Sequence, residues 1–398
     1  MSGLDRFADR LVVPRRVRRG AALTLVFASV LVTGAATGSW SEAAGDGRKT
    51  PPGSVRSDAV APLGGDGHTA ERASEAAAEA MADGKSAEKA AEEAVSRSGD
   101  RWGSVYSHGE YQEFEEALDG AYTGVGLWAR RGADGRMEVS RVQKGGPADR
   151  AGIRKGDRLR SIDGERVTGR PVTEVVALLR GDRAGTPVRL GLERATRAWS
   201  ETLRRARLST DSVTVTKLSG GAVMIKVAAF TKGSGEAVRS AVREAPEGAG
   251  ILLDLRGNSG GLVSEAVTAS SALVDGGLVA TYDVRGEQKA LHAERGGDTE
   301  RPVVTLVDGG TMSAAELLTG ALQDRGRAVV VGSRTFGKGS VQMPSRLPDG
   351  SVAELTVGHY RTPSGRTVDG RGITPDLEVE HGAEARAETV LTGLGPPS

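Results

Sequence analysis

The sequence contains no cysteine, and this absence excludes several kinds of chemistry. Without cysteine the chain has no disulfide, no thiol nucleophile and no thiolate metal site. The absence does not indicate a compartment, because a cysteine-free chain suits both reducing and oxidising surroundings.

Histidine is also scarce, with five among the 398 residues. None of them lies in a metal-ligand spacing such as HExxH, and all occur in polar, loop-like contexts without a supporting motif for a Ser-His-Asp triad. We therefore expect no catalytic metal and no other cofactor. The histidines are His68, His108, His292, His359 and His381.

Net charge is nearly absent, since 53 Lys and Arg residues face 52 Asp and Glu residues. No global field attracts nucleic acid or an acidic substrate, and we expect no nucleic-acid partner. The length is sufficient for two or three domains.

The first 41 residues have the pattern of an export signal. Four arginines between Arg15 and Arg19 precede an uncharged, largely apolar run that continues to Ser41. A basic front, an apolar middle and a small-residue exit are typical of a secretory signal, and the run is also long enough to span a bilayer. Residues 1–41 are therefore predicted to be a signal peptide or a membrane anchor through residues 21–38. The remainder is expected to be extracytoplasmic, either secreted or anchored to the cell membrane.

Composition divides the next part of the chain into three segments. Residues 42–68 are rich in Gly, Pro, Ser and charge, which predicts a flexible linker. Residues 69–117 are rich in Ala and Glu and are predicted to be helical, with a break at Gly84. Residues 118–196 combine short alternating strands with turn signals and a helix at Val172–Leu179, which indicates a small, mostly β domain.

From residue 197 to residue 380 the pattern becomes an alternation of strands and helices. This alternation predicts an α/β layer with parallel strand pairing. The expected strands are Val223–Val227, Ile251–Leu255, Val303–Val307 and Ala328–Val331, with helices at Ser234–Val242, Ser264–Val274 and Ser313–Gln323. Residues 381–398 are expected to form a C-terminal tail, to which we assign no strong role.

Ser313 is the candidate nucleophile. It follows a buried strand and the glycine-rich turn Asp308–Met312, and a helix begins beside it. Free backbone N–H groups at a helix N-terminus are suited to receive a developing oxyanion. The same pattern also fits a simple helix cap, because Ser313 and Glu316 have the spacing of a capping box.

Lys338 is the candidate base. A lysine replaces histidine as a general base when burial lowers its pKa. Lys338 follows the strand Ala328–Val331 and reaches the same sheet edge as Ser313 if the two strands are parallel. The alternatives are a solvated loop lysine and a phosphate-binding loop, and the second lacks the earlier glycine of a P-loop.

A second glycine turn, Asp254–Gly261, leaves the buried strand at Ile251–Leu255. Its backbone N–H groups are candidates for the same oxyanion site. An ordinary strand–helix turn explains the segment equally well.

Five motifs in order resemble one family, the carboxy-terminal processing peptidases, also called tail-specific proteases. Each motif is weak by itself, and their order and spacing between about Asp100 and Glu378 carry the resemblance. The motifs are Asp100–Tyr111, Tyr122–Leu127, Gly146–Asp157, Asp254–Gly261, and the pair Ser313–Glu316 and Thr335–Gly339 with Gln342.

The resemblance implies a fold and a catalytic apparatus. The fold is α/β, with a parallel-rich βαβ layered protease core at 197–380, an inserted, mostly β PDZ domain at 118–196, and N-terminal helices. The implied reaction is peptide-bond hydrolysis through an acyl-enzyme. The implied roles are nucleophile for Ser313, general base for Lys338, orientation of that lysine for Gln342, oxyanion hole for Gly260 and Ala314, and support for Asp324.

The resemblance also implies partners. The PDZ domain would bind polypeptide substrates by their C-terminal carboxylate, through Gly124, Val125, Gly126 and Leu127. Two departures are visible, because Ala315 and Gly103 stand where the family often has serine. Neither departure removes the nucleophile.

Two other functions compete with the peptidase interpretation. A PDZ scaffold with an inactive protease fold would be expected to have lost Ser313, Lys338 or Gln342, and all three are present. An α/β enzyme of acyl-thioester chemistry would share the glycine turns, but a domain that binds peptide ends argues against it.

Overall fold

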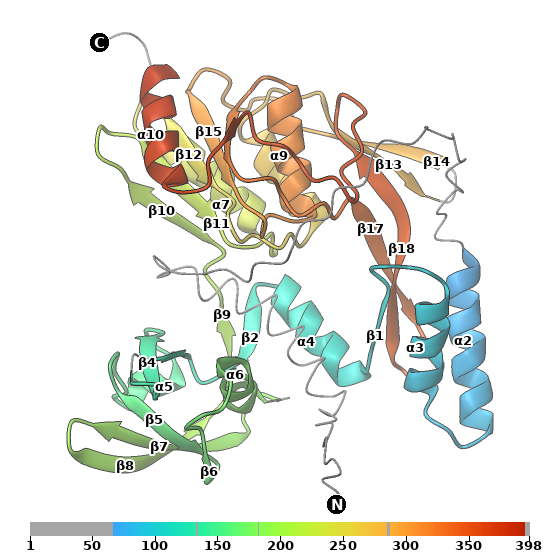
Figure 1. Cartoon of the computed structure of the whole chain (residues 1–398), viewed down its shortest axis with the longest axis vertical. Coiled ribbons are helices and arrows are strands. Elements are labelled where there is room, and N and C mark those ends of the chain that lie inside the picture. Colours follow the sequence, from blue (N-terminus) through green and yellow to red (C-terminus); the bar gives the residue numbers. More distant parts are fainter. Residues whose placement is uncertain (1–66, 133, 182, 285–286, 395–398) are drawn as a thin grey trace, which may run out of the picture. The chain divides into compact units, whose positions relative to one another are not determined.

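The computed structural model describes residues 67–132, 134–181, 183–284 and 287–394 (Figure 1). The predicted signal or anchor at 1–41 lies outside these residues, as does the linker apart from its last two positions. No helix of the described ranges is long and apolar enough to cross a membrane.

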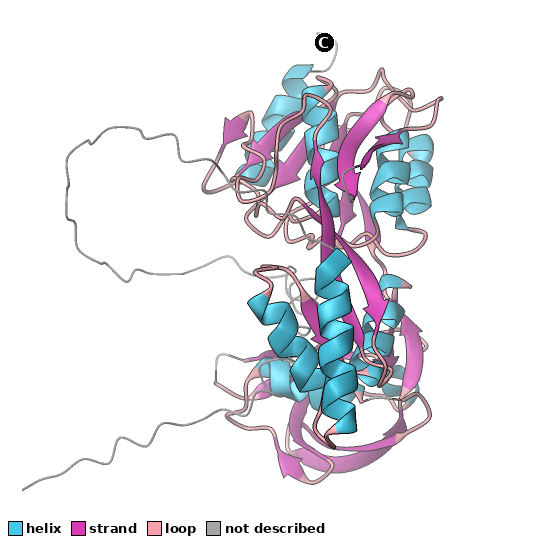
Figure 2. Ribbon diagram, turned by 90° about the vertical axis from the view of Figure 1, so that its right-hand side faces the viewer, coloured by secondary structure: helices cyan, strands magenta, loops and turns pink. Residues whose placement is uncertain are grey.

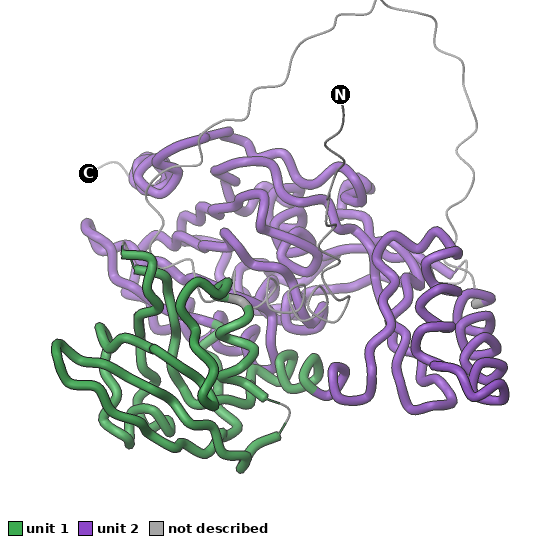
Figure 3. The backbone as a smooth tube through the Cα atoms, turned by 60° about the horizontal axis from the view of Figure 1, so that its bottom comes forward, with its two compact units in different colours: residues 1–31, 113–212 green, residues 32–112, 213–398 purple. Residues whose placement is uncertain are grey.

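The chain forms two compact units, which Figure 3 distinguishes by colour. The described part of the larger unit comprises residues 67–112 and the chain from Val213 onward, and that of the smaller unit lies within 113–212. Each has its own hydrophobic core.

The larger unit is built on a six-stranded sheet. The strand β10 is antiparallel to β11, and all other pairings are parallel, as the strand–helix alternation predicts. The strands lie in the order β10 (Val213–Lys217), β11 (Val223–Val227), β12 (Ile251–Asp254), β15 (Val303–Val307), β16 (Val329–Gly332) and β19 (Leu377–Glu378).

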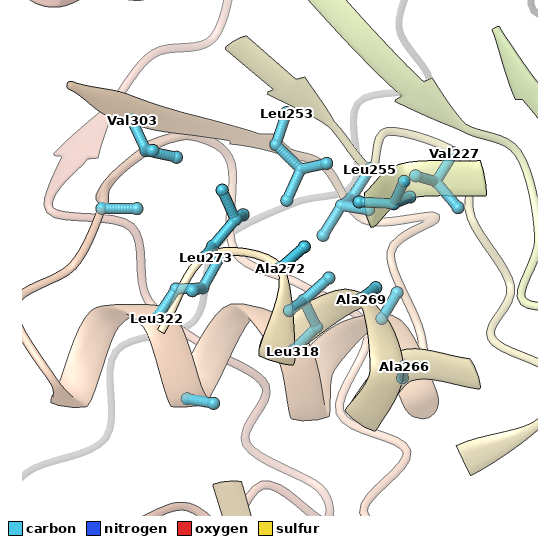
Figure 4. Close-up of a cluster of buried hydrophobic side chains, with 14 of the residues drawn as sticks. Val227, Leu253, Leu255, Ala266, Ala269, Ala272, Leu273, Val303, Leu318 and Leu322 are labelled. Atoms are coloured by element: carbon cyan, nitrogen blue, oxygen red, sulfur yellow. The ribbon is translucent and has the colours of Figure 1, made fainter. Parts of the chain in front are cut away.

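Helices cover both faces of this sheet, because its central strands are apolar on both sides (Figure 2). Leu253 and Leu255 belong to the cluster with α7 (Ser234–Glu244), α8 (Val263–Ser271) and α9 (Ala314–Asp324), part of which Figure 4 shows. Their neighbour Leu252 belongs to the cluster on the opposite face, together with α10 (Ala383–Leu394).

The expectation of a C-terminal tail without a strong role is wrong, because residues Ala383–Leu394 form the helix α10. It buries Ala387 and Leu391 against Leu252 and Val304 of the sheet. The Ala- and Glu-rich composition made this segment look like a solvated end, since Ala387 and Leu391 are its only fully buried side chains, with Ala383 and Val390 packed partly buried beside them.

A second, antiparallel sheet belongs to the same unit. The strands β17 (Ser340–Arg346) and β18 (Val352–Arg361) form a long hairpin that extends toward α2 (Gly67–Ala82) and α3 (Ala87–Arg97) (Figure 1). The break between these two helices confirms the predicted interruption at Gly84, which has φ +70°. The strands are β1 (Ser104–Tyr106), β18 (Val352–Arg361), β13 (Leu278–Val284) and β14 (Glu287–His292), with β17 (Ser340–Arg346) also paired to β18.

The smaller unit is mostly β, as predicted. It contains the short helix α5 (Pro147–Arg150) and the longer helix α6 (Val172–Arg180), which packs on the sheet core. The sheet has the order β3 (Leu127–Arg131), β4 (Met137–Val142), β5 (Arg158–Ile162), β7 (Pro187–Arg194) and β8 (Arg197–Arg204), with β6 (Glu165–Arg166) paired to β5.

This unit extends beyond the boundary expected at residue 196. The strand β8 pairs with β7 along its whole length, and β9 (Ala206–Ser209) pairs with β2 (Ala121–Gly124). The unit is entered through α4 (His108–Leu118), most of which lies within the segment 69–117 that was predicted to be helical. Alternating strands that belong to neighbouring domains look alike in sequence, so the pattern alone does not locate the boundary.

Candidate active site

Ser313 lies at the end of the turn between β15 and α9, directly before the helix begins. Its backbone has φ 52° and ψ −117°, and it is one of three described non-glycine residues with positive φ. Such a conformation is strained for an L-residue and persists only when surrounding contacts impose it. One such contact is the Glu316 carboxylate, which accepts a hydrogen bond from the Ser313 N–H at 2.9 Å.

Lys338 reaches the same edge of the sheet. The strands β15 and β16 are parallel, and Val307 pairs with Gly332, so the segments that follow them leave together. The Lys338 ammonium is half-buried and donates a hydrogen bond to Gln342 Oε1 at 2.7 Å. Burial lowers the pKa of Lys338, while the charges of Glu354 and Asp100 act to raise it. The lowered pKa is the direction that a lysine base requires.

The orientation of Gln342 is imposed by a distant part of the chain. Its Nε2 donates to the backbone carbonyl of Trp102 at 2.5 Å, which leaves Oε1 to face Lys338 Nζ. Trp102 is held in turn by Asp100, which accepts from the Trp102 N–H at 3.0 Å and from the Thr356 N–H at 2.7 Å. The segment before β1 is therefore part of the site.

Glu316 has a larger role than the cap that its spacing indicates. Its side chain is fully buried, and its two oxygens accept four hydrogen bonds, all from the segments of Ser313 and Lys338. Burial raises its pKa, and the hydrogen bonds oppose this effect. Two sequence signals point to Glu316: it ends the Ser313–Glu316 motif, and it lies three residues after Ser313, a spacing that a cap explains equally well.

The predicted oxyanion donors differ in availability. No described residue accepts a hydrogen bond from the N–H of Ala314, which begins α9 directly after Ser313. Gly260 lies against Ser313, since a Cβ added to it would be 2.8 Å from Ser313 Cβ. Its N–H, however, donates to Asn258 Oδ1 at 2.8 Å. In this conformation Gly260 supplies close approach, and its N–H is already paired.

Asp324 does not join the group formed by Ser313, Lys338 and Gln342. It ends α9, whereas Ser313 precedes that helix, and eleven residues of α-helix span about 16 Å. Its carboxylate accepts hydrogen bonds from Ser364 and pairs with Arg366. Any support from Asp324 is therefore indirect, through the turn that contains Ser364.

The predicted carboxylate-binding loop connects β2 and β3 in the smaller unit. Gly126 has φ +76°, and a Cβ there would approach both Gln143 and Leu208 to 3.3 Å, so the loop requires glycine at this position. The adjacent Val125 is buried and accepts from the Ala148 N–H through its carbonyl. The loop is thus anchored in the core of its unit.

Among the described residues no group of three His, Asp or Glu side chains is placed to hold a metal ion.

Comparison with known proteins identifies the family. Residues 222–379 match Peptidase family S41, and residues 138–194 match the PDZ domain. The chain is 31% identical over 286 residues to the carboxy-terminal processing protease CtpA of Bacillus subtilis (strain 168), covering 71% of this chain and 61% of that protein. It is 31% identical over 293 residues to the carboxy-terminal-processing protease of Bartonella bacilliformis, covering 70% of this chain and 67% of that protein.

A solved structure is also similar, the photosystem II D1 C-terminal processing protease. The match has 28% sequence identity and a TM-score of 0.49, and it covers 78% of this chain and 86% of that chain. The chain spans 57% to 61% of the length of three of its curated relatives.

The chain belongs to peptidase family S41 and carries a PDZ domain. The family recognised from five motifs and the layered α/β fold with its mostly β domain are therefore confirmed.

Proposed function

We propose that this protein is a serine endopeptidase of the carboxy-terminal processing type, with Ser313 as nucleophile and Lys338 as general base. One observation supports the pairing above the others. A single oxygen, Glu316 Oε2, accepts hydrogen bonds from the backbone N–H of Ser313 at 2.9 Å and of Lys338 at 2.8 Å. The backbone nitrogens of the two residues therefore lie within about 6 Å of each other.

The mechanism follows from the chemistry of these groups. Neutral Lys338 takes the proton of the Ser313 hydroxyl as its oxygen attacks a peptide carbonyl. The N–H of Ala314 is a free donor for the oxyanion that forms. Lys338 then gives its proton to the leaving amine, and water hydrolyses the acyl-enzyme to free Ser313.

The substrate is proposed to be a polypeptide that the PDZ domain holds by its C-terminus. In this mode the tail adds a strand to the domain edge, and the carboxylate meets backbone N–H groups in the loop Gly124–Leu127. We propose an extracytoplasmic location, with residues 1–41 as signal or membrane anchor. This proposal rests on the sequence pattern of that segment.

The test is cleavage of an unfolded protein with an apolar C-terminus by the chain from Thr69 onward. Wild type is expected to cut, whereas Ser313→Ala and Lys338→Ala should not. Amidation of the substrate C-terminus should slow cleavage. If Ser313→Ala still cuts, the assigned site is wrong; if folded wild type never cuts yet binds free C-termini, the PDZ-scaffold function replaces the peptidase.

A further inference from the structure

The side chains of Glu316 and Tyr360 each contact the backbones of both Ser313 and Lys338. We propose that Glu316 and Tyr360 are positioning residues that act together, as an active-site clamp, to fix the backbones of Ser313 and Lys338. The proposal rests on the proposed function, since it takes Ser313 and Lys338 as the reacting pair.

Glu316 holds the N–H side of both residues. Its Oε2 accepts from the N–H groups of Ser313 and Lys338, as described above. Its Oε1 accepts from Thr335 Oγ1 at 2.5 Å and from the Gly337 N–H at 2.7 Å. No arginine, lysine or histidine among the described residues forms an ion pair with this carboxylate. A fully buried charge is costly unless its hydrogen bonds are satisfied, and here all four partners belong to the active-site segments.

Tyr360 holds the carbonyl side of both residues. It lies on β18, is 2% exposed, and its hydroxyl contacts the backbone carbonyl of Ser313 at 2.8 Å and that of Lys338 at 3.2 Å. A phenol has a single proton, so the two carbonyls share one donor. The peptide groups on either side of both reacting residues are thus bound by the clamp.

This arrangement explains how the strained backbone of Ser313 persists. The Ser313 N–H donates to Glu316, and the Ser313 carbonyl accepts from Tyr360. The peptide groups on both sides of the φ and ψ bonds of Ser313 are therefore held in place. The same two side chains hold Lys338, so a shift of one reacting residue is resisted by contacts that include the other. Misplacement of reacting groups by about 1 Å can lower a rate by about 10²-fold, which sets the expected size of the effect.

The test compares Tyr360→Phe with a matched control in the full-length chain. Phe keeps the buried ring and removes only the hydroxyl. The control is Thr319→Val, which removes a buried hydroxyl on α9 that donates only to the Ala315 carbonyl at 2.7 Å. Readouts are kcat and KM for peptide cleavage, the rate of Ser313 acylation by a short activated peptide ester, and the Tm.

We expect Tyr360→Phe to lower kcat and the acylation rate by about 10²-fold with KM changed less than about twofold. Thr319→Val should lower the Tm to a similar extent and keep kcat. Glu316→Gln should resemble Tyr360→Phe, because an amide replaces one acceptor oxygen by a donor that faces N–H groups. If Glu316→Gln does not fold, Tyr360→Phe still decides.

Equal kcat for Tyr360→Phe and Thr319→Val, beside an active wild type and an inactive Ser313→Ala, would overturn the clamp and leave the proposed function intact. Cleavage by Ser313→Ala would overturn both proposals. A loss confined to Tm, with normal acylation per folded molecule, would show that Tyr360 is an ordinary core residue and would also reject the clamp.

Discussion

Lys338, the proposed base, shows how the surroundings of a single residue set its pKa. Its ammonium is half-buried, which lowers the pKa, and the nearby carboxylates Glu354 and Asp100 act in the opposite direction. Asp100 also binds backbone N–H groups and holds Trp102, whereas Glu354 is the carboxylate whose charge can be removed with less disturbance. The balance between burial and these charges decides the pH at which the lysine becomes neutral.

Glu354→Gln is expected to move the active pH range toward acid. Removal of a negative charge near Lys338 takes away a contribution that raises its pKa, so the neutral lysine forms at lower pH. The rising limb of kcat/KM against pH should therefore shift to lower pH, since that profile reports the free enzyme's base. Glu378→Gln, at an exposed position on β19, is the control and should leave the limb in place. A shift toward alkaline pH for Glu354→Gln would contradict the assignment of Lys338 as base.

Gly260→Ala is expected to reduce activity by far more than any accompanying loss of fold stability would explain. The added Cβ would lie 2.8 Å from Ser313 Cβ, and the backbone has φ +99°. We expect kcat/KM to fall by about 10²-fold or more. Gly309→Ala adds a methyl group to the neighbouring turn with nothing within 4 Å. Comparable losses in both variants, at equal folded fraction, would show that Gly260 has no special relation to the nucleophile.

At the scale of elements, α10 is the piece whose role only packing reveals. Its side chain Leu391 fills the space beside Gly250, where a Cβ would meet three Leu391 atoms within 3.2 Å. The helix is also tied to the turn after β12, since Glu384 pairs with Arg256 at 2.8 Å. The helix thus closes the face of the sheet opposite α9.

Leu391→Ala is expected to destabilise the larger unit by about 2–4 kcal/mol, because it leaves a cavity between α10 and the sheet. Leu394→Ala on the same helix is the control; this leucine is 46% exposed, and its truncation should cost less than about 0.5 kcal/mol. Denaturant unfolding measures both. Similar midpoints for the two variants would mean that α10 does not contribute to the core.

At the scale of the whole molecule, the two units have separate cores, so a defect in one need not unfold the other. This separation makes it possible to test peptide-tail binding and peptide-bond cleavage independently. The loop Gly124–Leu127 belongs to one unit, and Ser313 and Lys338 belong to the other.

Gly126→Val is expected to weaken binding of free C-termini while leaving acylation by a short peptide ester unchanged. Valine is strained at φ +76°, and its Cβ would crowd Gln143 and Leu208. Fluorescence anisotropy with a labelled peptide should show an affinity at least about tenfold weaker, which corresponds to a loss of more than about 1.4 kcal/mol of binding free energy. Gly135→Ala shares the positive φ but has open space around it, and it should bind normally. Unchanged binding by Gly126→Val would remove this loop from the proposed tail site.

Much of this architecture was determined by the sequence alone. Unbroken apolar runs such as Val303–Val307 predict strands buried on both faces, and the helices between them predict parallel pairing, because both patterns are local. The candidate pair Ser313 and Lys338 follows from the same logic, since each comes just after such a strand. The break near Gly84 was likewise predictable from one residue's conformational freedom.

Only the tertiary structure decided which groups surround that pair. The Trp102 carbonyl that orients Gln342 lies 240 residues away from it, and Tyr360 lies 47 residues after Ser313. Neither contact leaves a periodic or local signal, because a backbone carbonyl is common to every residue and a buried tyrosine reads as core. The same limit applies to Asp324, for which the family resemblance implied support of the site, whereas it lies at the end of α9 that is far from Ser313. Spacing in sequence predicts chemistry within a turn or a helix, whereas contacts between distant segments depend on how the strands and helices pack.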